Sequence, residues 1–158
     1  MQARPGVIDR LNTILTIELT AINQYFVQAE MCKNWGYERL YEKFRNSSLT
    51  EMKDTPGIIA HILYLEGVPN MQRLNQVRVG ETVLENLNLD LQLEQEAVEA
   101  LREAITHCQS VGDYTTRRMF EEMIASEEEH IDWIENQLEA IRQIGIELYL
   151  SQQLKDED

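Results

Sequence analysis

Four long stretches of this sequence place apolar residues at alternating steps of three and four, the spacing of an amphipathic helix. They run from about residue 5 to 34, 38 to 65, 82 to 111 and 113 to 144. Pro5 lies near the first turn of the first stretch and Gly36 just past its end. Thr82 and Glu85 form a capping box before the third stretch. The sequence therefore predicts an all-α fold built from four long helices.

The connections between these helices differ greatly in length. Short loops join the first helix to the second and the third to the fourth, so each pair should be antiparallel neighbours. Residues 67–81 join the second helix to the third, which is enough chain to run the length of a bundle. Two short loops and one long crossover predict a ferritin-like four-helix bundle. The segment "GIELYLSQQL" predicts a short fifth helix, and we expect a single domain over residues 1–158 with a disordered tail at about 155–158.

The charge balance is strongly acidic, with 28 Asp and Glu against 14 Lys and Arg and a net charge of −14. Such a surface repels nucleic acid and anionic lipid and attracts cations, so neither nucleic acid nor a membrane is an expected partner. No apolar run approaches the length of a membrane span, and the opening "MQARPGVIDR" has no signal core, which predicts a cytoplasmic protein. Cys32 and Cys108 fit neither a disulfide framework nor a C-x-x-C site and are predicted to be reduced core residues.

Each of the four apolar rows is interrupted near its middle by a carboxylate, and the four are Glu18, Glu51, Glu94 and Glu127. A buried carboxylate costs several kcal/mol unless it is paired. No Lys or Arg lies in these rows, so a divalent metal is the remaining counter-charge. His130, three residues after Glu127, adds an imidazole, and Asp54 stands at the same spacing after Glu51. Oxygen ligands with little imidazole suit iron or manganese rather than a structural zinc site.

Any one of these residues alone has an ordinary alternative. A single glutamate in an apolar row is more often a surface residue assigned to the wrong register, and a single core histidine more often has a purely structural role. The joint pattern favours a metal site, because four independent rows are interrupted at corresponding heights. His61 has no acid partner one turn away and is interpreted as structural, and His107 is interpreted as a surface residue near a helix end.

Seven blocks of the chain match one family closely. They are "IELTAINQYF" around Glu18, "KNWG" at 33–36, "EMK" at 51–53, "ILYLEGVPN" at 62–70, "DLQLEQEA" around Glu94, "DYTTRRM" at 113–119 and "EEEHIDWIE" at 127–135. With these blocks the sequence resembles bacterioferritin along essentially its whole length. The resemblance implies iron storage and detoxification in a hollow shell of twenty-four subunits, with Fe(II) oxidised at a di-iron ferroxidase centre in each bundle and kept as ferric mineral. It also implies a ferredoxin-type reductant for release of the iron.

The resemblance assigns roles to individual residues of the di-iron centre. Glu18 and Glu94 match terminal ligands, Glu51 and Glu127 match the carboxylates that bridge the two irons, His130 matches a ligand of one iron, and Tyr25 matches the aromatic residue beside the centre. "KNWG", Glu66, Asp132 and Glu139 match residues of an uptake pore, for which structural roles are an alternative.

Met52 matches the axial ligand of a haem b that lies between two subunits related by two-fold symmetry and assists electron transfer. Met52 is about 100° from Glu51 around the helix, so it should face away from the metal and towards a neighbouring subunit. The alternative is that it only fills a gap in packing, as methionine often does.

The chain departs from the family at "DTPG", residues 54–57. The family has histidine where this chain has Asp54, and an ordinary helix where it has Pro56 and Gly57. A proline inside a helix costs about 3 kcal/mol and a glycine about 1 kcal/mol, which predicts a break or kink near residues 53–56. Two roles are then open for Asp54, as an iron ligand or, with Thr55, as the N-cap of a restarted helix.

These departures predict an impaired ferroxidase centre, whose activity is weak or depends on a second kind of subunit. Some bacterioferritins mix two subunit types, and this chain is similar to the haem-bearing type, so both a homomeric and a mixed shell are open. The alternatives are a di-iron peroxidase or oxygenase with no storage role, and a structural partner that binds no metal.

Overall fold

The computed structural model describes residues 1–155, and its helices follow the order expected from the sequence. They are α1 (Val7–Trp35), α2 (Glu38–Tyr64), α3 (Val83–Ser110), α4 (Tyr114–Ile144) and the short α5 (Ile146–Ser151). No strand occurs within residues 1–155. The predicted all-α fold with four long helices and a short fifth one is confirmed. Of the tail predicted at 155–158, residues 156–158 lie outside the described part of the chain.

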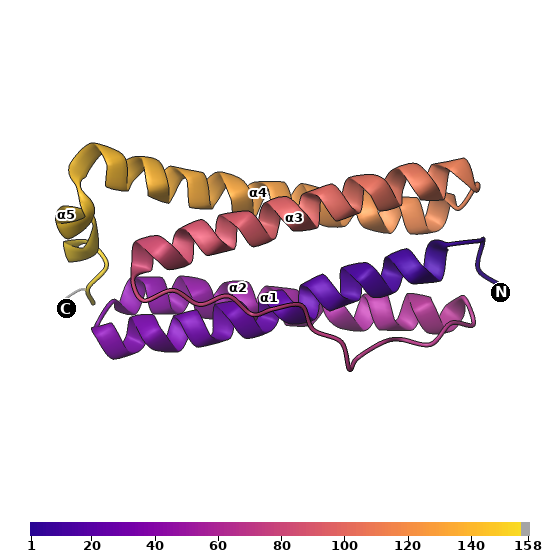
Figure 1. Ribbon diagram of the computed structural model, residues 1–158, viewed down its shortest axis with the longest axis horizontal. Coiled ribbons are helices and arrows are strands. Elements are labelled where there is room, and N and C mark those ends of the chain that lie inside the picture. The colour runs from indigo at the N-terminus through magenta and orange to yellow at the C-terminus, as the bar shows by residue number, and fades with distance from the viewer. Residues whose placement is uncertain (156–158) are drawn as a thin grey trace.

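The long helices form two layers, one of α1 and α2 and the other of α3 and α4 (Figure 1). The two helices of each layer are antiparallel, because a short loop reverses the chain between them. The crossover between α2 and α3 starts at the end of the bundle where α2 finishes and runs back along the outside to the start of α3 (Figure 1). α5 packs against α4 at the end of the bundle that also holds the α1–α2 loop (Figure 1).

The end of α1 and the start of α3 have the local chemistry that the sequence predicted, whereas α1 begins at Val7, so Pro5 precedes the helix instead of lying in its first turn. Gly36 ends α1 with a φ of 86°, a left-handed conformation that costs glycine little. The Thr82 hydroxyl accepts a hydrogen bond from the Glu85 N–H at 3.1 Å and caps α3. Asp113 caps α4 in the same way, accepting from the Thr116 N–H at 2.9 Å. These caps fix the height at which each helix starts, and therefore the height of the acids within it.

α2 is continuous from Glu38 to Tyr64 with Pro56 in its interior, so the break predicted near residues 53–56 was wrong. The N-cap role considered for Asp54 is wrong as well, because no helix begins there. The Thr55 hydroxyl instead donates to the carbonyl of Glu51 at 2.9 Å, as a threonine inside a helix does.

The packing of α2 explains why the helix survives its proline. The buried residues on either side of Pro56 are Ser48, Glu51, Thr55, Ile58 and Ile62. This row keeps helical spacing through the proline, and tertiary packing of such a face supplies most of a helix's stability. Pro56 and Gly57 both lie on the exposed side. The tendency of "TPG" to break a helix is therefore outweighed by the packing of the buried residues next to Pro56 and Gly57.

The core consists of two apolar clusters. Along α2 and along α4, the buried glutamate of the helix lies between residues of the two clusters. One cluster contains the Tyr25, Ile62, Leu101 and Phe120 side chains, and the other contains Phe44, Leu87 and Ile141. Cys32 and Cys108 are free and buried in these clusters, as predicted. Among the helices of residues 1–155, none is long and apolar enough to cross a membrane.

A buried polar network fastens the crossover to the bundle. The side-chain oxygen Oε1 of Gln24 accepts a hydrogen bond from the backbone N–H of Arg78 at 3.1 Å, and Nε2 of the same side chain donates to Oδ1 of Asp90 at 2.8 Å. One turn before Asp90 on α3, the Asn86 side chain accepts from the Gly80 N–H at 2.7 Å. The Gln24, Asn86 and Asp90 side chains are fully buried, and their hydrogen bonds hold the crossover in register with α1 and α3.

Candidate metal centre

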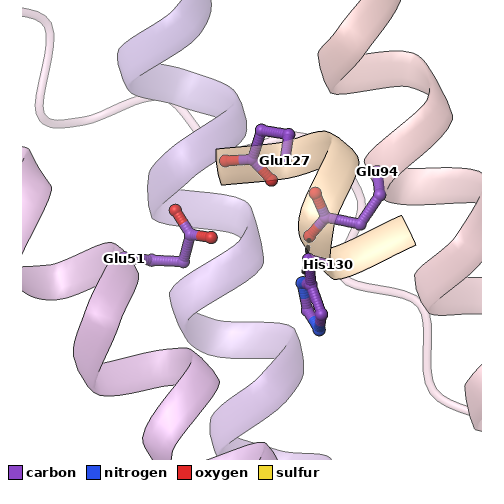
Figure 2. A group of neighbouring side chains, drawn as sticks. All are labelled: Glu51, Glu94, Glu127 and His130. Atoms are coloured by element: carbon purple, nitrogen blue, oxygen red, sulfur yellow. Dashed lines mark hydrogen bonds and ion pairs between the residues drawn. The ribbon is translucent and has the colours of Figure 1, made fainter. Parts of the chain in front are cut away.

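Four of the predicted site residues converge in the middle of the bundle. Glu51 comes from α2, Glu94 from α3, and Glu127 and His130 from successive turns of α4. One ligand atom from each lies within 4.8 Å of all the others. Figure 2 shows the three carboxyl groups turned towards one another, with the His130 ring below Glu94. The spacing of three residues brings Glu127 and His130 to the same side of α4.

Glu18 on α1 lies beside this group but is not part of the tight set of four. Its side chain is buried and linked to Glu51 by a hydrogen bond. Burial, this bond and the charge of Glu51 raise the pKa of Glu18 well above its usual value. The centre therefore comprises four carboxyl groups, one from each long helix, and one imidazole.

The surroundings disfavour negative charge on these carboxyl groups. Burial raises the pKa of both Glu51 and Glu94 from 4.5 to about 7. Burial, a hydrogen bond to Glu94 and the charge of Glu94 also raise the pKa of Glu127. Burial lowers the pKa of His130, so the imidazole is held neutral, the form that binds metals. No lysine or arginine of residues 1–155 forms an ion pair with these glutamates.

Several oxygen atoms of the group have no partner in the part of the chain that the structure describes. They are Oε2 of Glu18, Oε2 of Glu51 and Oε2 of Glu94. Leaving a buried polar atom unpaired costs about 1–3 kcal/mol, and more for a charged group. Buried carboxyl groups with unpaired oxygens and no lysine or arginine in an ion pair with them are the kind of groups that a divalent cation satisfies. The donor set of carboxylate oxygens and one imidazole suits iron or manganese.

Tyr25 lies directly against the group and is fully buried. Its hydroxyl donates a hydrogen bond to Oε1 of Glu94, which also contacts Nδ1 of His130 at 3.2 Å. The Tyr25 ring packs edge-on against the His130 ring, with centroids 5.3 Å apart. Tyr25 therefore orients both Glu94 and His130.

Asp54 and Met52 have surroundings unlike that of Glu51, although all three are on one turn of α2. Asp54 is exposed and outside the tight set of four, because the buried row steps four residues from Glu51 to Thr55 rather than three to Asp54. Placing Asp54 in the core row was therefore wrong. Met52 is 51% exposed and faces away from the group, as its position on the helix predicted.

The remaining histidines make structural contacts. His61 Nε2 lies 2.8 Å from the Thr116 hydroxyl, which itself donates to the α4 cap Asp113. His107 is partly exposed near the end of α3, where Nε2 donates to the Pro5 carbonyl at 2.6 Å.

Two polar residues near the site were not predicted from the sequence. Asp90 is fully buried, and its spacing of four residues before Glu94 could have revealed it. Lys43 lies on α2 beside Trp133 of α4, and only the packing of these two helices brings them together.

The bundle, its single crossover and the central group of carboxylates with one histidine define a ferritin-like protein. Residues 8–144 match the Ferritin-like domain family accordingly. Over 152 residues the chain is 45% identical to bacterioferritin from Mycolicibacterium paratuberculosis, covering 96% of each chain. It is 44% identical to bacterioferritin from Streptomyces coelicolor, over 96% of this chain and 90% of the relative. It is 40% identical to that from Brucella melitensis, over 94% and 92%. The chain belongs to the bacterioferritin family.

Proposed function

We propose that this chain is a subunit of a cytoplasmic iron store that takes up Fe(II), oxidises it and keeps it as ferric mineral inside a shell of twenty-four subunits. The observation that carries the proposal is the buried group of Glu51, Glu94, Glu127 and His130, whose ligand atoms lie within 4.8 Å of one another. The acidic surface, with a net charge of −14, favours the approach of cations.

Iron is the substrate of this group. In the proposed arrangement Glu18 and Glu94 hold one iron each, Glu51 and Glu127 lie between the two, and His130 supplies the single nitrogen ligand. Two Fe(II) ions give one electron each to dioxygen, which takes up two protons and leaves as hydrogen peroxide; peroxide can serve as oxidant in its place. Tyr25 keeps Glu94 oriented through its hydrogen bond.

The centre should oxidise iron more slowly than one with two histidines. Asp54 stands where the family has the second histidine, and it is exposed and outside the tight set. Its negative charge still reaches the centre, because it contributes to the raised pKa of Glu51. We expect an oxidation rate that is low for this chain alone and higher in a shell mixed with a second, intact subunit type.

Met52 is the proposed ligand of a haem. A thioether is a suitable axial ligand for haem iron, and Met52 presents its sulfur on an exposed face of α2. Ser48 of α2 bonds to the Ile22 carbonyl, so this face adjoins the α1 surface that carries the exposed Phe26. Met52 would hold haem b between two copies of the chain, and the haem would pass electrons to the mineral from a ferredoxin-type reductant when iron is released.

The test combines assembly with oxidation kinetics. The purified protein should have the mass of a large shell, contain iron and show a haem absorbance band that Met52→Leu abolishes. Adding two Fe(II) per chain under air should give slow oxidation, which Glu127→Gln slows further. A rapid burst that saturates at two irons would contradict the impaired centre, and a monomer or dimer without iron would contradict storage.

A peroxidase or oxygenase with no storage role is the second candidate. A cavity of about 300 Å³ reaches Glu51 and His130 and could hold a small substrate. Peroxide-dependent or oxygen-dependent turnover of an organic substrate by a small assembly would favour this function.

A further inference from the structure

The cavity beside the metal centre has a lysine in its wall. It has a volume of about 300 Å³ between α2 and α4, and Glu51 and His130 form part of its wall. A cation that enters here arrives directly at two members of the metal-binding group. The wall also contains Lys43, and we call this space the Lys43 cavity.

Lys43 presents its charge to this cavity without an ion-pair partner in residues 1–155. Its Nζ lies 4.6 Å above the centre of the Trp133 ring, a contact that favours the charged ammonium. Burial lowers the pKa of Lys43, which reflects its half-buried position. Glu129 also lines the cavity, but no ion pair joins it to Lys43 within residues 1–155. Lys43 and His130 line the same cavity, so the charge of Lys43 lies beside the way to a member of the metal-binding group.

A second cavity, on the same pair of helices, provides a comparison. It has a volume of about 350 Å³ and is lined by Lys53, Asp54 and Glu122 among others. Ser126 belongs to the walls of both cavities. None of the four tightly grouped ligands lines the second cavity. Each cavity thus contains one lysine, and the Lys43 cavity is the one with direct access to the ligands.

We propose that Lys43 is an electrostatic gate that slows the passage of divalent cations through the Lys43 cavity to the metal centre. Like charges repel most strongly in a confined, partly dehydrated space, where the effective dielectric constant is far below that of water. A divalent ion that passes the ammonium of Lys43, which has no ion-pair partner in residues 1–155, therefore meets a barrier that a neutral side chain would not raise. The inference rests on the proposed function only in that the centre must bind a divalent metal.

Binding of Co²⁺, a coloured substitute for Fe(II), to the metal-free assembled protein tests the gate without any oxidation step. Stopped-flow absorbance would compare the unmodified protein with Lys43→Met, Lys43→Arg and the matched control Lys53→Met. We expect Lys43→Met to bind Co²⁺ about three- to tenfold faster at low salt. Lys43→Arg should bind at the unmodified rate. The difference should become smaller at 1 M salt, where the Debye length falls to about 3 Å, and should not vanish, because charges in a partly buried cavity are screened less than charges on the surface.

The outcomes separate the gate from the proposed function. If all four proteins bind Co²⁺ at the same rate, the gate is wrong and the metal centre stands. If Lys53→Met is accelerated and Lys43→Met is not, the ions pass through the second cavity and the gate is wrong. If the unmodified protein binds no Co²⁺ and Glu127→Gln is indistinguishable from it, the proposed function fails and the gate fails with it.

Discussion

The buried glutamates are the residues on which this molecule's behaviour depends most. Each of the four long helices places one of them at the middle of the bundle, where burial favours the protonated form. Without metal, the protein therefore has to retain protons on groups that are normally ionised at neutral pH. Stability and metal binding should both depend on pH for this reason.

We expect the metal-free protein to lose stability as the pH rises from about 4.5 to about 7. The pKa of Glu51 and of Glu94 is 4.5 in an unfolded chain and about 7 in the folded one. Below 4.5 both states are protonated; above it the unfolded state ionises first and is favoured until the folded state also ionises. Urea unfolding at pH 5 and pH 8 measures the loss. Glu51→Gln should flatten the profile, whereas the exposed control Glu135→Gln should not; equal slopes in both variants would contradict this origin.

Tyr25→Phe should destabilise the metal-free protein by about 1–3 kcal/mol, because it removes the hydroxyl that donates to buried Glu94. The hydrogen bond from Tyr25 partly offsets the raised pKa of Glu94, so its loss should raise that pKa further. Denaturant unfolding measures the first effect, and the pH dependence of Co²⁺ binding measures the second. Tyr114→Phe removes an exposed hydroxyl and should change neither; a matching loss in that variant would show that the contact with Glu94 is not responsible.

At the level of elements, α2 contains two residues that lower the local stability of a helix. Pro56 leaves the carbonyl of Met52 without its helical donor, and Gly57 follows on the exposed side. The helix persists because the buried row beside them packs against the rest of the bundle. The strain of the "DTPG" segment is therefore retained inside a continuous helix rather than released by a break.

Pro56→Ala should stabilise the protein by up to about 3 kcal/mol, since it restores the missing donor and removes the clash of the ring. Gly57→Ala should add about 1 kcal/mol, because a Cβ at Gly57 would meet no atom within 4 Å. Thermal unfolding of the metal-free assembly should show a larger rise in Tm for the first variant than for the second. A fall in Tm for Pro56→Ala would mean that the proline relieves strain in the native helix.

The sequence allowed the helices, their order and the convergence of Glu51, Glu94, Glu127 and His130 to be predicted, because helical spacing and connection lengths are local properties. The exposed position of Asp54 could not be predicted, because the apolar pattern allows the buried row to step either three or four residues on from Glu51, and only packing decides between them. The survival of α2 through Pro56 could not be predicted either, since local propensity favours a break and burial opposes it. The contact of Lys43 with Trp133 depends on how α2 and α4 pack together, and the residue pattern of a single helix carries no information about that packing.

For the molecule as a whole, metal binding should be a source of stability. A metal that binds the folded state at a hundred times its Kd adds about 2.7 kcal/mol per site. We therefore expect Co²⁺ to raise the Tm of the metal-free protein at pH 7 and a chelator to reverse the rise. Glu94→Gln should reduce the rise, whereas Glu135→Gln should leave it unchanged. An identical rise in all variants would place the stabilising metal elsewhere on the acidic surface.

The crossover has a consequence for how this chain folds. The helices of each layer are neighbours in sequence, so each layer can form as an independent hairpin from local contacts. The only covalent connection between the hairpins is the crossover, whose residues 71–76 are exposed. A single cut within 71–76 would leave both hairpins whole, with Gln24 in one piece and Arg78, Asn86 and Asp90 in the other. The protein should then behave as two complementary fragments that reassociate, with the metal ligands divided between them.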